Sequence, residues 1–342
     1  MITLTTQAIQ NHDDARGAAW RHALRMAFRD PHELLEYLGL PADLIAGAEQ
    51  PIREFPLLVP RGYAARMQRG DPHDPLLRQV LPLGIENAKV PGFVADPVGD
   101  LTSLAGPGLL HKYQGRALLI ATGACAIHCR YCFRRHFPYA EASASRGHWA
   151  EVLETLRAHP EIDEIILSGG DPLMLDDDKL GELVSALEHL PQLRRLRVHT
   201  RLPIVLPERV DDALLAWIGR SRLQVICVIH ANHANELDHS VAHALTRLRD
   251  VGVTLLNQSV LLRGVNDHAE ILSELSLRLF ECGVMPYYLH LLDPVAGAAH
   301  FEIEEQDATH IVRAVRARLP GYLVPRLVRE EAGQPSKTDI PL

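Results

Sequence analysis

Several features that would place this chain in other classes of protein are missing from its sequence. No apolar run approaches 18 residues, so the sequence predicts no transmembrane helix. The first residues lack the basic and apolar regions of a secretory signal peptide. Acidic residues outnumber lysine and arginine, and the net charge of -8 offers no attraction for nucleic acid or an anionic membrane. We therefore expect neither nucleic acid nor membrane as a partner.

Cysteine is also scarce, and its distribution is uneven. Three of the five cysteines, Cys125, Cys129 and Cys132, are spaced C-x3-C-x2-C, whereas Cys227 and Cys282 are expected to be small core residues. Three clustered cysteines cannot all pair with one another, and the chain has no secretion signal, so disulfides are not expected. Free thiols suit a reducing compartment, and we therefore expect a cytoplasmic protein. Clustered thiolates bind iron–sulfur clusters, usually as a set of four. Three ligands would leave one iron open to a substrate or cofactor.

This spacing resembles the signature of radical S-adenosylmethionine (SAM) enzymes, in which SAM binds the open iron of a [4Fe-4S] cluster. A structural zinc site is the alternative interpretation. Zinc takes four Cys or His ligands, and His128 or His136 could complete the set.

From about residue 110 onward, β-rich runs alternate with amphipathic helical patterns. Successive runs begin roughly 30 residues apart, which is the length of a βαβ unit. Their apolar character is typical of a parallel sheet covered by helices, and repeated units would curl into a full or partial (β/α) barrel. The pattern leaves a closed eight-fold and an open six-fold barrel both open. The runs are 117–122, 164–168, 196–200, 223–229, 253–257, 287–291 and 322–328.

The first hundred residues have a different pattern. Short amphipathic helices are expected between residues 19 and 84, after a polar segment at 1–18. Residues 85–108 are rich in Pro, Gly and Asp, which is typical of a linker. This part of the chain carries no chemistry that the sequence can assign.

Polar residues follow almost every predicted strand, and active sites in such barrels lie at the C-terminal ends of strands. Gly169 and Gly170 would let the backbone approach a ligand, although they could equally form a plain turn. Lys337 could bind pyridoxal phosphate (PLP) covalently or be an ordinary tail residue. The converging residues are the three cysteines, Ser168 to Pro172, His199 to Arg201, His230, Asn232, His233, Asn235, Glu236, Asn257, Gln258, His290, Asp293 and Lys337.

A series of motifs, in one order, resembles the lysine 2,3-aminomutase family of radical SAM enzymes. They include CRYCFRRHFPY (129–139), SGGDPL (168–173), LLNQSVLLRGVND (255–267) and EEAGQPSK (330–337). The resemblance covers most of the chain from about residue 55. Within the family it is greatest to the proteins that take part in beta-lysylation of elongation factor P.

The resemblance implies a partial, six-fold parallel (β/α) barrel of radical SAM type with an N-terminal helical extension. It divides the chain into an extension and linker at 1–108, the barrel at 109–328 and a PLP-lysine segment at 329–342.

The resemblance also implies a role for each matching residue. Cys125, Cys129 and Cys132 would hold the [4Fe-4S] cluster. Arg134 would bind the substrate carboxylate, and Asp293 and Glu330 would pair with the far ammonium group. The family has Asp where this chain has Glu330, so substrate preference or rate could differ. The expected cofactor-binding residues are Lys337, which would bind PLP covalently, and Tyr113, Arg116, Ser168, Gly169, Gly170, Asp171 and Gln258.

The implied activity is an isomerase reaction that converts L-lysine into (R)-β-lysine, which a separate ligase attaches to elongation factor P. Two alternatives stay open: an aminomutase that serves another pathway, and a metal-binding scaffold without catalysis. The acidic pair Asp293 and Glu330 argues against glutamate as the substrate. The sequence ends at residue 342, without the C-terminal extension of longer aminomutases, so we expect a monomer or a small homo-oligomer.

Overall fold

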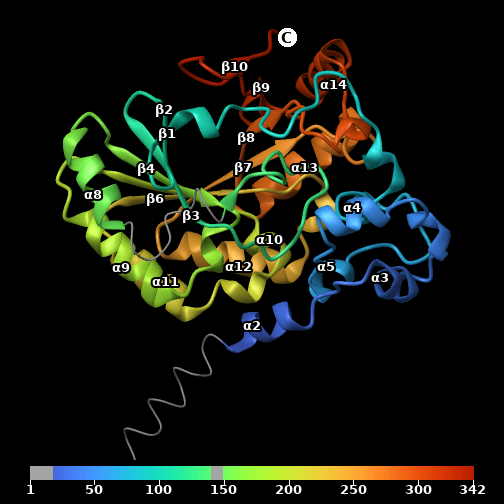
Figure 1. Cartoon of the computed structure of the whole chain (residues 1–342), viewed down its shortest axis with the longest axis horizontal. Helices are drawn as coiled ribbons and strands as arrows, with labels where there is room; N and C mark the ends of the chain where they lie inside the picture. Colours follow the sequence, from blue (N-terminus) through green and yellow to red (C-terminus); the bar gives the residue numbers. More distant parts are fainter. Residues whose placement is uncertain (1–17, 140–148) are drawn as a thin grey trace, which may run out of the picture.

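One open sheet organises the protein. The computed structural model describes residues 18–139 and 149–342, and its ten strands lie in chain order from β1 to β10 (Figure 1). All strands from β3 to β9 pair in parallel. They are β3 (Arg116–Thr122), β4 (Glu164–Gly169), β5 (Arg195–Thr200), β6 (Gln224–Ile229), β7 (Thr254–Val260), β8 (Met285–His290) and β9 (Arg326–Arg329).

The partial barrel is confirmed, since no pairing among the described residues closes the sheet between β1 and β10. The parallel part has seven strands, one more than the six expected. The additional strand is β9, which the sequence pattern had predicted as a run at 322–328.

Antiparallel strands complete both edges of the sheet. At one edge, β1 (Leu104–Gly106) and β2 (Leu109–Tyr113) precede β3, and at the other edge β10 (Thr338–Asp339) pairs with β9. Tyr113 ends β2, and Lys337 directly precedes β10. The edge strands therefore fix the backbone beside two residues expected to bind a cofactor.

The stretch expected to be a linker is structured. It contains the 3₁₀ helices η2 (Gly84–Asn87) and η3 (Leu101–Ser103) as well as β1. The carboxylate of Asp96 accepts hydrogen bonds from the backbone N–H groups of Asp100 and Leu101 at 3.0 and 3.1 Å, which closes the turn before η3. Pro and Gly here mark turns in a packed segment.

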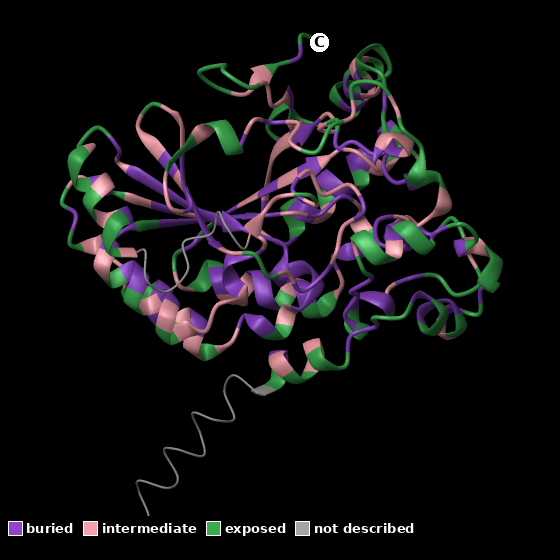
Figure 2. Cartoon of the chain, viewed as in Figure 1, coloured by how far each residue is buried: buried purple, intermediate pink, exposed green. Residues whose placement is uncertain are grey.

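Helices cover the outer face of the sheet, and their apolar sides are buried against it (Figure 2). Within the described ranges, none of the helices is both long and apolar enough to cross a bilayer. The outer helices are α8 (Trp149–Ala158), α9 (Asp177–Glu188), α11 (Asp212–Arg220), α12 (His239–Asp250), α13 (Ala269–Glu281) and α14 (Glu305–Arg318), and the short α10 (Leu202–Val205) follows β5.

The N-terminal extension packs against one side of the barrel (Figure 1). Its buried side chains, including Tyr63 and Leu76, belong to the same hydrophobic cluster as Ile204 and Leu237 of the barrel. The extension and barrel thus fold around a shared core. The helices of the extension are α2 (Ala18–Arg25), α3 (Pro31–Leu38), α4 (Glu49–Glu54), α5 (Arg61–Ala64) and α6 (Pro75–Arg78). Residues 1–17 of the expected extension and 140–148 of the expected barrel lie outside the described residues.

Candidate active site

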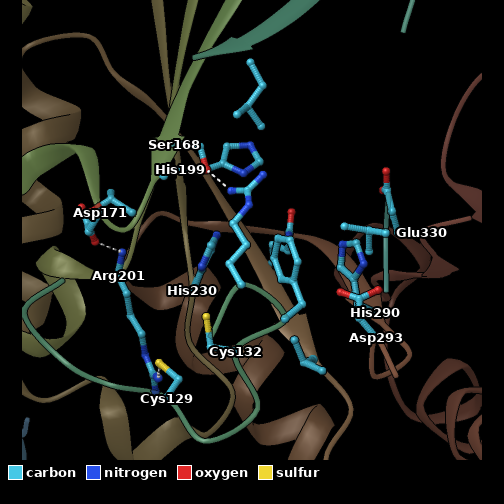
Figure 3. Close-up of a pocket in the computed structure, with 18 of the residues that line it drawn as sticks. Cys129, Cys132, Ser168, Asp171, His199, Arg201, His230, His290, Asp293 and Glu330 are labelled. Atoms are coloured by element: carbon cyan, nitrogen blue, oxygen red, sulfur yellow. Dashed lines mark hydrogen bonds between the residues drawn. The ribbon is translucent and has the colours of Figure 1, made fainter. Parts of the chain in front are cut away.

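A cavity of about 530 Å³ lies among the loops that follow the parallel strands. Every residue to which the resemblance gave a role lines it, whereas five of the residues expected to converge at strand ends do not: Pro172, His233, Asn235, Glu236 and Asn257. Figure 3 shows Cys129 and Cys132 toward one side, with Asp293 and Glu330 on the other. The assigned residues are Tyr113, Arg116, Cys125, Cys129, Cys132, Arg134, Ser168, Gly169, Gly170, Asp171, Gln258, Asp293, Glu330 and Lys337.

The three cysteines lie on the loop after β3, and all are free and half-buried. Burial raises the pKa of Cys132 to about 11, and the neighbouring Cys129 adds to the shift. Burial likewise raises the pKa of Cys125, with Cys132 as a further cause. Thiols this close together become thiolates at the same time only when bound cations compensate their charge. This donor set fits an iron–sulfur cluster, in which each cysteine binds a different iron.

The zinc alternative lacks support in the described residues. Among them, no group of three or more His, Cys, Asp or Glu side chains could hold a single metal ion. The Nδ1 atom of His128 hydrogen-bonds with the carbonyl oxygen of Pro56 at 2.7 Å, and its ring stacks on Phe55. His136 Nε2 lies 3.1 Å from the carbonyl oxygen of Ala296. Both histidines proposed as a fourth zinc ligand therefore already have backbone partners.

Gly169 and Gly170 are required by the cysteine loop itself. A Cβ atom on Gly170 would lie 2.3 Å from the carbonyl oxygen of Ala124, and one on Gly169 would lie equally close to that of Thr122. Gly169 also has φ of 131°, a conformation that L side chains rarely adopt. The glycines thus let the end of β4 pack directly beneath the cysteine loop. Contact with SAM stays a prediction for both residues.

Asp171 holds two loops together. Its carboxylate accepts hydrogen bonds from the Thr200 hydroxyl at 2.7 Å and from the backbone N–H groups of Arg201 and Leu202 at 2.7 and 3.1 Å. Burial raises its pKa to about 6. These bonds join the loop after β4 to the loop after β5 and position Arg201.

Arg134 is buried and held by two side chains. Its Nε donates to Asp100 Oδ2 at 2.7 Å and its Nη1 donates to Ser168 Oγ at 3.0 Å. Lys112 Nζ lies 2.6 Å from the other oxygen of Asp100. The sequence reasoning missed Asp100 and Lys112, because Asp100 falls in the stretch interpreted as a linker. Only its burial, which the sequence pattern does not encode, would have distinguished it.

Lys337 lies on the opposite side of the cavity from the cysteines. Its Nζ pairs with Glu330 Oε2 at 2.9 Å, and the Tyr113 hydroxyl donates to the other oxygen of Glu330. Although burial alone would raise the pKa of Glu330, Lys337 and Tyr113 outweigh it and lower that pKa. The Arg116 guanidinium lies 4.4 Å from the centre of the Tyr113 ring. Glu330, Tyr113 and Lys337 therefore form one connected group beside the edge strands.

Three histidines also line the cavity, and Figure 3 shows one of them, His290, beside Asp293. His199 is the last residue but one of β5, His230 follows β6 and His290 ends β8. The Nε2 atom of each is buried without a hydrogen-bond partner among the described residues. Burial lowers the pKa of all three, and it lowers that of His230 to about 4. They are therefore neutral at pH 7 and can hydrogen-bond a bound molecule.

The N-terminal extension clamps the cysteine loop. Arg130, between two of the cysteines, is fully buried and pairs with Glu86 through Nε and Nη2 at 2.9 and 2.5 Å. Arg135 Nη2 joins the same carboxylate at 2.8 Å. The backbone N–H groups of His128 and Arg130 donate to Leu58 and Gln79 at 3.1 and 2.8 Å. The extension, to which the sequence assigned no chemistry, thus shapes the cysteine loop.

Replacing Glu86 with Gln should destabilise the protein by about 3 to 5 kcal/mol, since it leaves two buried arginines without a counter-charge. Urea unfolding measures this loss. Glu270→Gln removes an exposed pair with Arg318 and should cost no more than about 1 kcal/mol. Equal losses in the two variants would contradict the clamp.

Two acids that line the cavity, Asp293 and Asp100, should respond oppositely to substitution. Burial raises the pKa of Asp293 to about 7, so its folded form holds a proton that the unfolded chain loses above pH 4. Asp293→Asn should therefore stabilise the ligand-free protein by about 1 to 2 kcal/mol at pH 7.5 and by less at pH 4.5.

Asp100 supplies the contrast. Burial would raise its pKa, but Arg134 and Lys112 outweigh this and lower it, so its stabilising charge persists down to about pH 4. Asp100→Asn should cost about 3 kcal/mol at both pH values. Thermal unfolding of both variants at pH 4.5 and 7.5 tests these two predictions. A gain in stability for Asp293→Asn that does not grow with pH would contradict the raised pKa of Asp293.

The fold and the three-cysteine loop define a radical SAM protein, and the model of the Radical SAM superfamily matches residues 119–218. Similarity extends well beyond that region. The L-lysine 2,3-aminomutase of Escherichia coli is 52% identical over 94% of each chain. That of Haemophilus influenzae is 47% identical over 93% of this chain and 94% of its own. That of Clostridium subterminale is 31% identical over 99% of this chain and 82% of its own. The chain belongs to the lysine 2,3-aminomutase family.

Proposed function

We propose that this protein is an L-lysine 2,3-aminomutase that converts L-lysine into (R)-β-lysine with a [4Fe-4S] cluster, SAM and PLP. The observation that carries the proposal is the single cavity that joins the cysteine loop to Lys337 and its acidic partner. When bound, the cluster and SAM supply a radical that removes hydrogen from the substrate, and PLP supplies the conjugated system for migration of the amino group.

The chain's own residues would bind and orient the substrate. Arg134 offers a planar guanidinium for the carboxylate, and its partners Asp100 and Ser168 fix its direction. Asp293 and Glu330 offer negative charge for the far ammonium group. Glu330 already holds one ammonium group, that of Lys337, at 2.9 Å. If Lys337 holds PLP, its side chain would be directed toward that group, and Glu330 would be available for the ammonium group of the substrate.

The acidic end of the cavity also discriminates between substrates. The carboxylate of a glutamate side chain would lie against Asp293 and Glu330 and be repelled. We therefore propose lysine over glutamate.

The proposed test uses protein that is purified anaerobically and reconstituted with iron, sulfide and PLP. Lysine, SAM and a reductant should yield β-lysine, resolved from α-lysine and assigned as the R enantiomer by chiral chromatography, and glutamate should yield no β-isomer. A cluster without PLP binding would overturn the aminomutase and keep the radical SAM assignment. Protein that contains zinc but binds neither the iron–sulfur cluster nor PLP would favour the alternative of a metal-binding scaffold without catalysis.

We further propose that the β-lysine supplies the ligase that modifies elongation factor P, in the cytoplasm, where clustered thiols stay reduced. The motifs shared with the elongation factor P beta-lysylation proteins support this link. Mass spectrometry of elongation factor P after incubation with enzyme, ligase and lysine tests it, and an unmodified factor despite β-lysine formation would favour another pathway. We expect a monomer or small homo-oligomer, which a stable tetramer in sedimentation would contradict.

A further inference from the structure

Arg201 connects the cysteine loop to a buried polar network. It is 6% exposed, and its Nη1 donates to Cys129 Sγ at 2.6 Å. Its Nη2 donates to Gln79 Oε1 at 2.7 Å, to Glu236 Oε2 at 2.8 Å and to the Tyr63 hydroxyl at 3.2 Å. We call these four residues, Arg201, Gln79, Glu236 and Tyr63, the Arg201 network. It joins the extension, which supplies Tyr63 and Gln79, to a predicted iron ligand.

The guanidinium is held in its charged form and in one orientation. An arginine side chain stays protonated in proteins, and the buried Glu236 carboxylate at 2.8 Å supplies its counter-charge. The backbone N–H of Arg201 donates to Asp171 at 2.7 Å, so both ends of the residue are fixed. Its Nε is buried and has no partner among the described residues, which leaves one further donor for a group bound at the cysteines.

A fixed donor beside a ligand sulfur has a defined electrostatic effect. Reduction adds a negative charge to an iron–sulfur cluster, and hydrogen bonds to its sulfurs and nearby positive charge stabilise the reduced form. In a buried site this interaction is weakly screened. Arg201 should favour reduction, and the fully buried Glu236, at 2.8 Å from Arg201, should oppose it.

We propose that Arg201 is a positioning residue that raises the reduction potential of the cluster at Cys125, Cys129 and Cys132, and that the N-terminal extension sets this effect through Tyr63 and Gln79. The proposal rests on the cluster binding of the proposed function but not on PLP or on the substrate. It gives the extension a role in the electron transfer to the cluster.

The test is a redox titration of the reconstituted cluster, followed by electron paramagnetic resonance and normalised to bound iron. At a fixed potential, Arg201→Gln should lower the ratio of reduced to oxidised cluster about tenfold, which is about 59 mV for a one-electron couple. Glu236→Gln should raise the ratio, because it leaves the charge of Arg201 uncompensated. General structural damage would not produce shifts of opposite sign.

Arg209 provides a matched control. It is fully buried, donates to the carbonyl of Leu173 at 2.7 Å and pairs with Asp177 at 2.8 Å, and it has no hydrogen bond to a cysteine in the described part of the chain. Arg209→Gln should leave the ratio unchanged within about twofold. Arg201→Lys, which keeps the charge, should restore part of the loss.

Shifts of the same sign in Arg201→Gln and Glu236→Gln, or shifts no larger than that of Arg209→Gln, would overturn the proposal. If the Arg201→Gln protein loses its iron, Glu236→Gln and Tyr63→Phe provide the test. We expect the ratio of reduced to oxidised cluster to rise in Glu236→Gln and to fall in Tyr63→Phe. The absence of both shifts would overturn the proposal. Wild-type protein that binds no iron and sulfide would instead overturn the cluster assignment, and this proposal with it.

Discussion

Replacing Cys132 with alanine should give a folded protein that binds no stable [4Fe-4S] cluster and forms no β-lysine. The loop after β3 carries only three thiols, so the loss of one leaves two irons without a protein ligand. Turnover should fall by at least about three orders of magnitude, because no other side chain replaces the missing ligand. Iron and sulfide analysis and the visible spectrum after reconstitution measure the first effect.

Cys227→Ala is the matched control for this variant. Cys227 is buried in β6, 4% exposed, and burial raises the pKa of its thiol to about 12, so it stays a thiol. Its loss removes a small buried side chain and should cost about 1 kcal/mol without loss of iron. Full cluster content in Cys132→Ala, or equal iron loss in both variants, would contradict the assignment of the loop.

Replacing Lys337 with alanine should abolish the covalent attachment of PLP and reduce β-lysine formation by about three orders of magnitude or more. Lys337 is 2.9 Å from Glu330 and lines the same cavity as the cysteines. After incubation with PLP and borohydride, peptide mass spectrometry of the wild-type protein should identify the label on residue 337. The iron content of the variant should equal that of the wild type.

Lys179 serves as the control, because its Nζ pairs with Asp176 at 3.0 Å on the outer helix α9. Lys179→Ala should keep both the label on Lys337 and the activity. Labelling spread over several lysines, or an active Lys337→Ala, would contradict the assignment.

Local patterns were sufficient to predict the parallel strands. Each predicted strand from 117–122 to 287–291 overlaps an observed one. β4 and β6 are nearly continuous buried runs, whereas β5 and β7 alternate between buried and more exposed residues, and both patterns are typical of strands. The antiparallel strands β1, β2 and β10 were not predicted. They are short, and Thr338 and Asp339 of β10 form a strand only by pairing with β9, which is a tertiary contact.

The candidate site likewise contains residues that the local sequence predicts and residues that depend on tertiary contacts. Residues with distinctive chemistry at strand ends, such as Cys132 and Lys337, were predicted from their position and type. Asp100 and Gln79 were missed, because their importance lies in partners far away in the sequence. Asp171 was predicted to contact a cofactor, and the structure shows its carboxylate bonded to the loop after β5. A sequence pattern identifies the residue but does not specify its partner.

The hydrogen bond between Gln79 of the extension and Glu236 of the barrel has a consequence for the order of events during translation. Glu236 lies 157 residues further along the chain than Gln79, so the ribosome synthesises one partner of this bond long before the other. Until residue 236 emerges, the contacts of the extension with the cysteine loop can form, but Arg201 beside Cys129 lacks its acidic partner Glu236. Delivery of iron and sulfide by the cell's assembly machinery should therefore follow synthesis of β6. Ribosome-bound chains stalled before that point should retain no cluster.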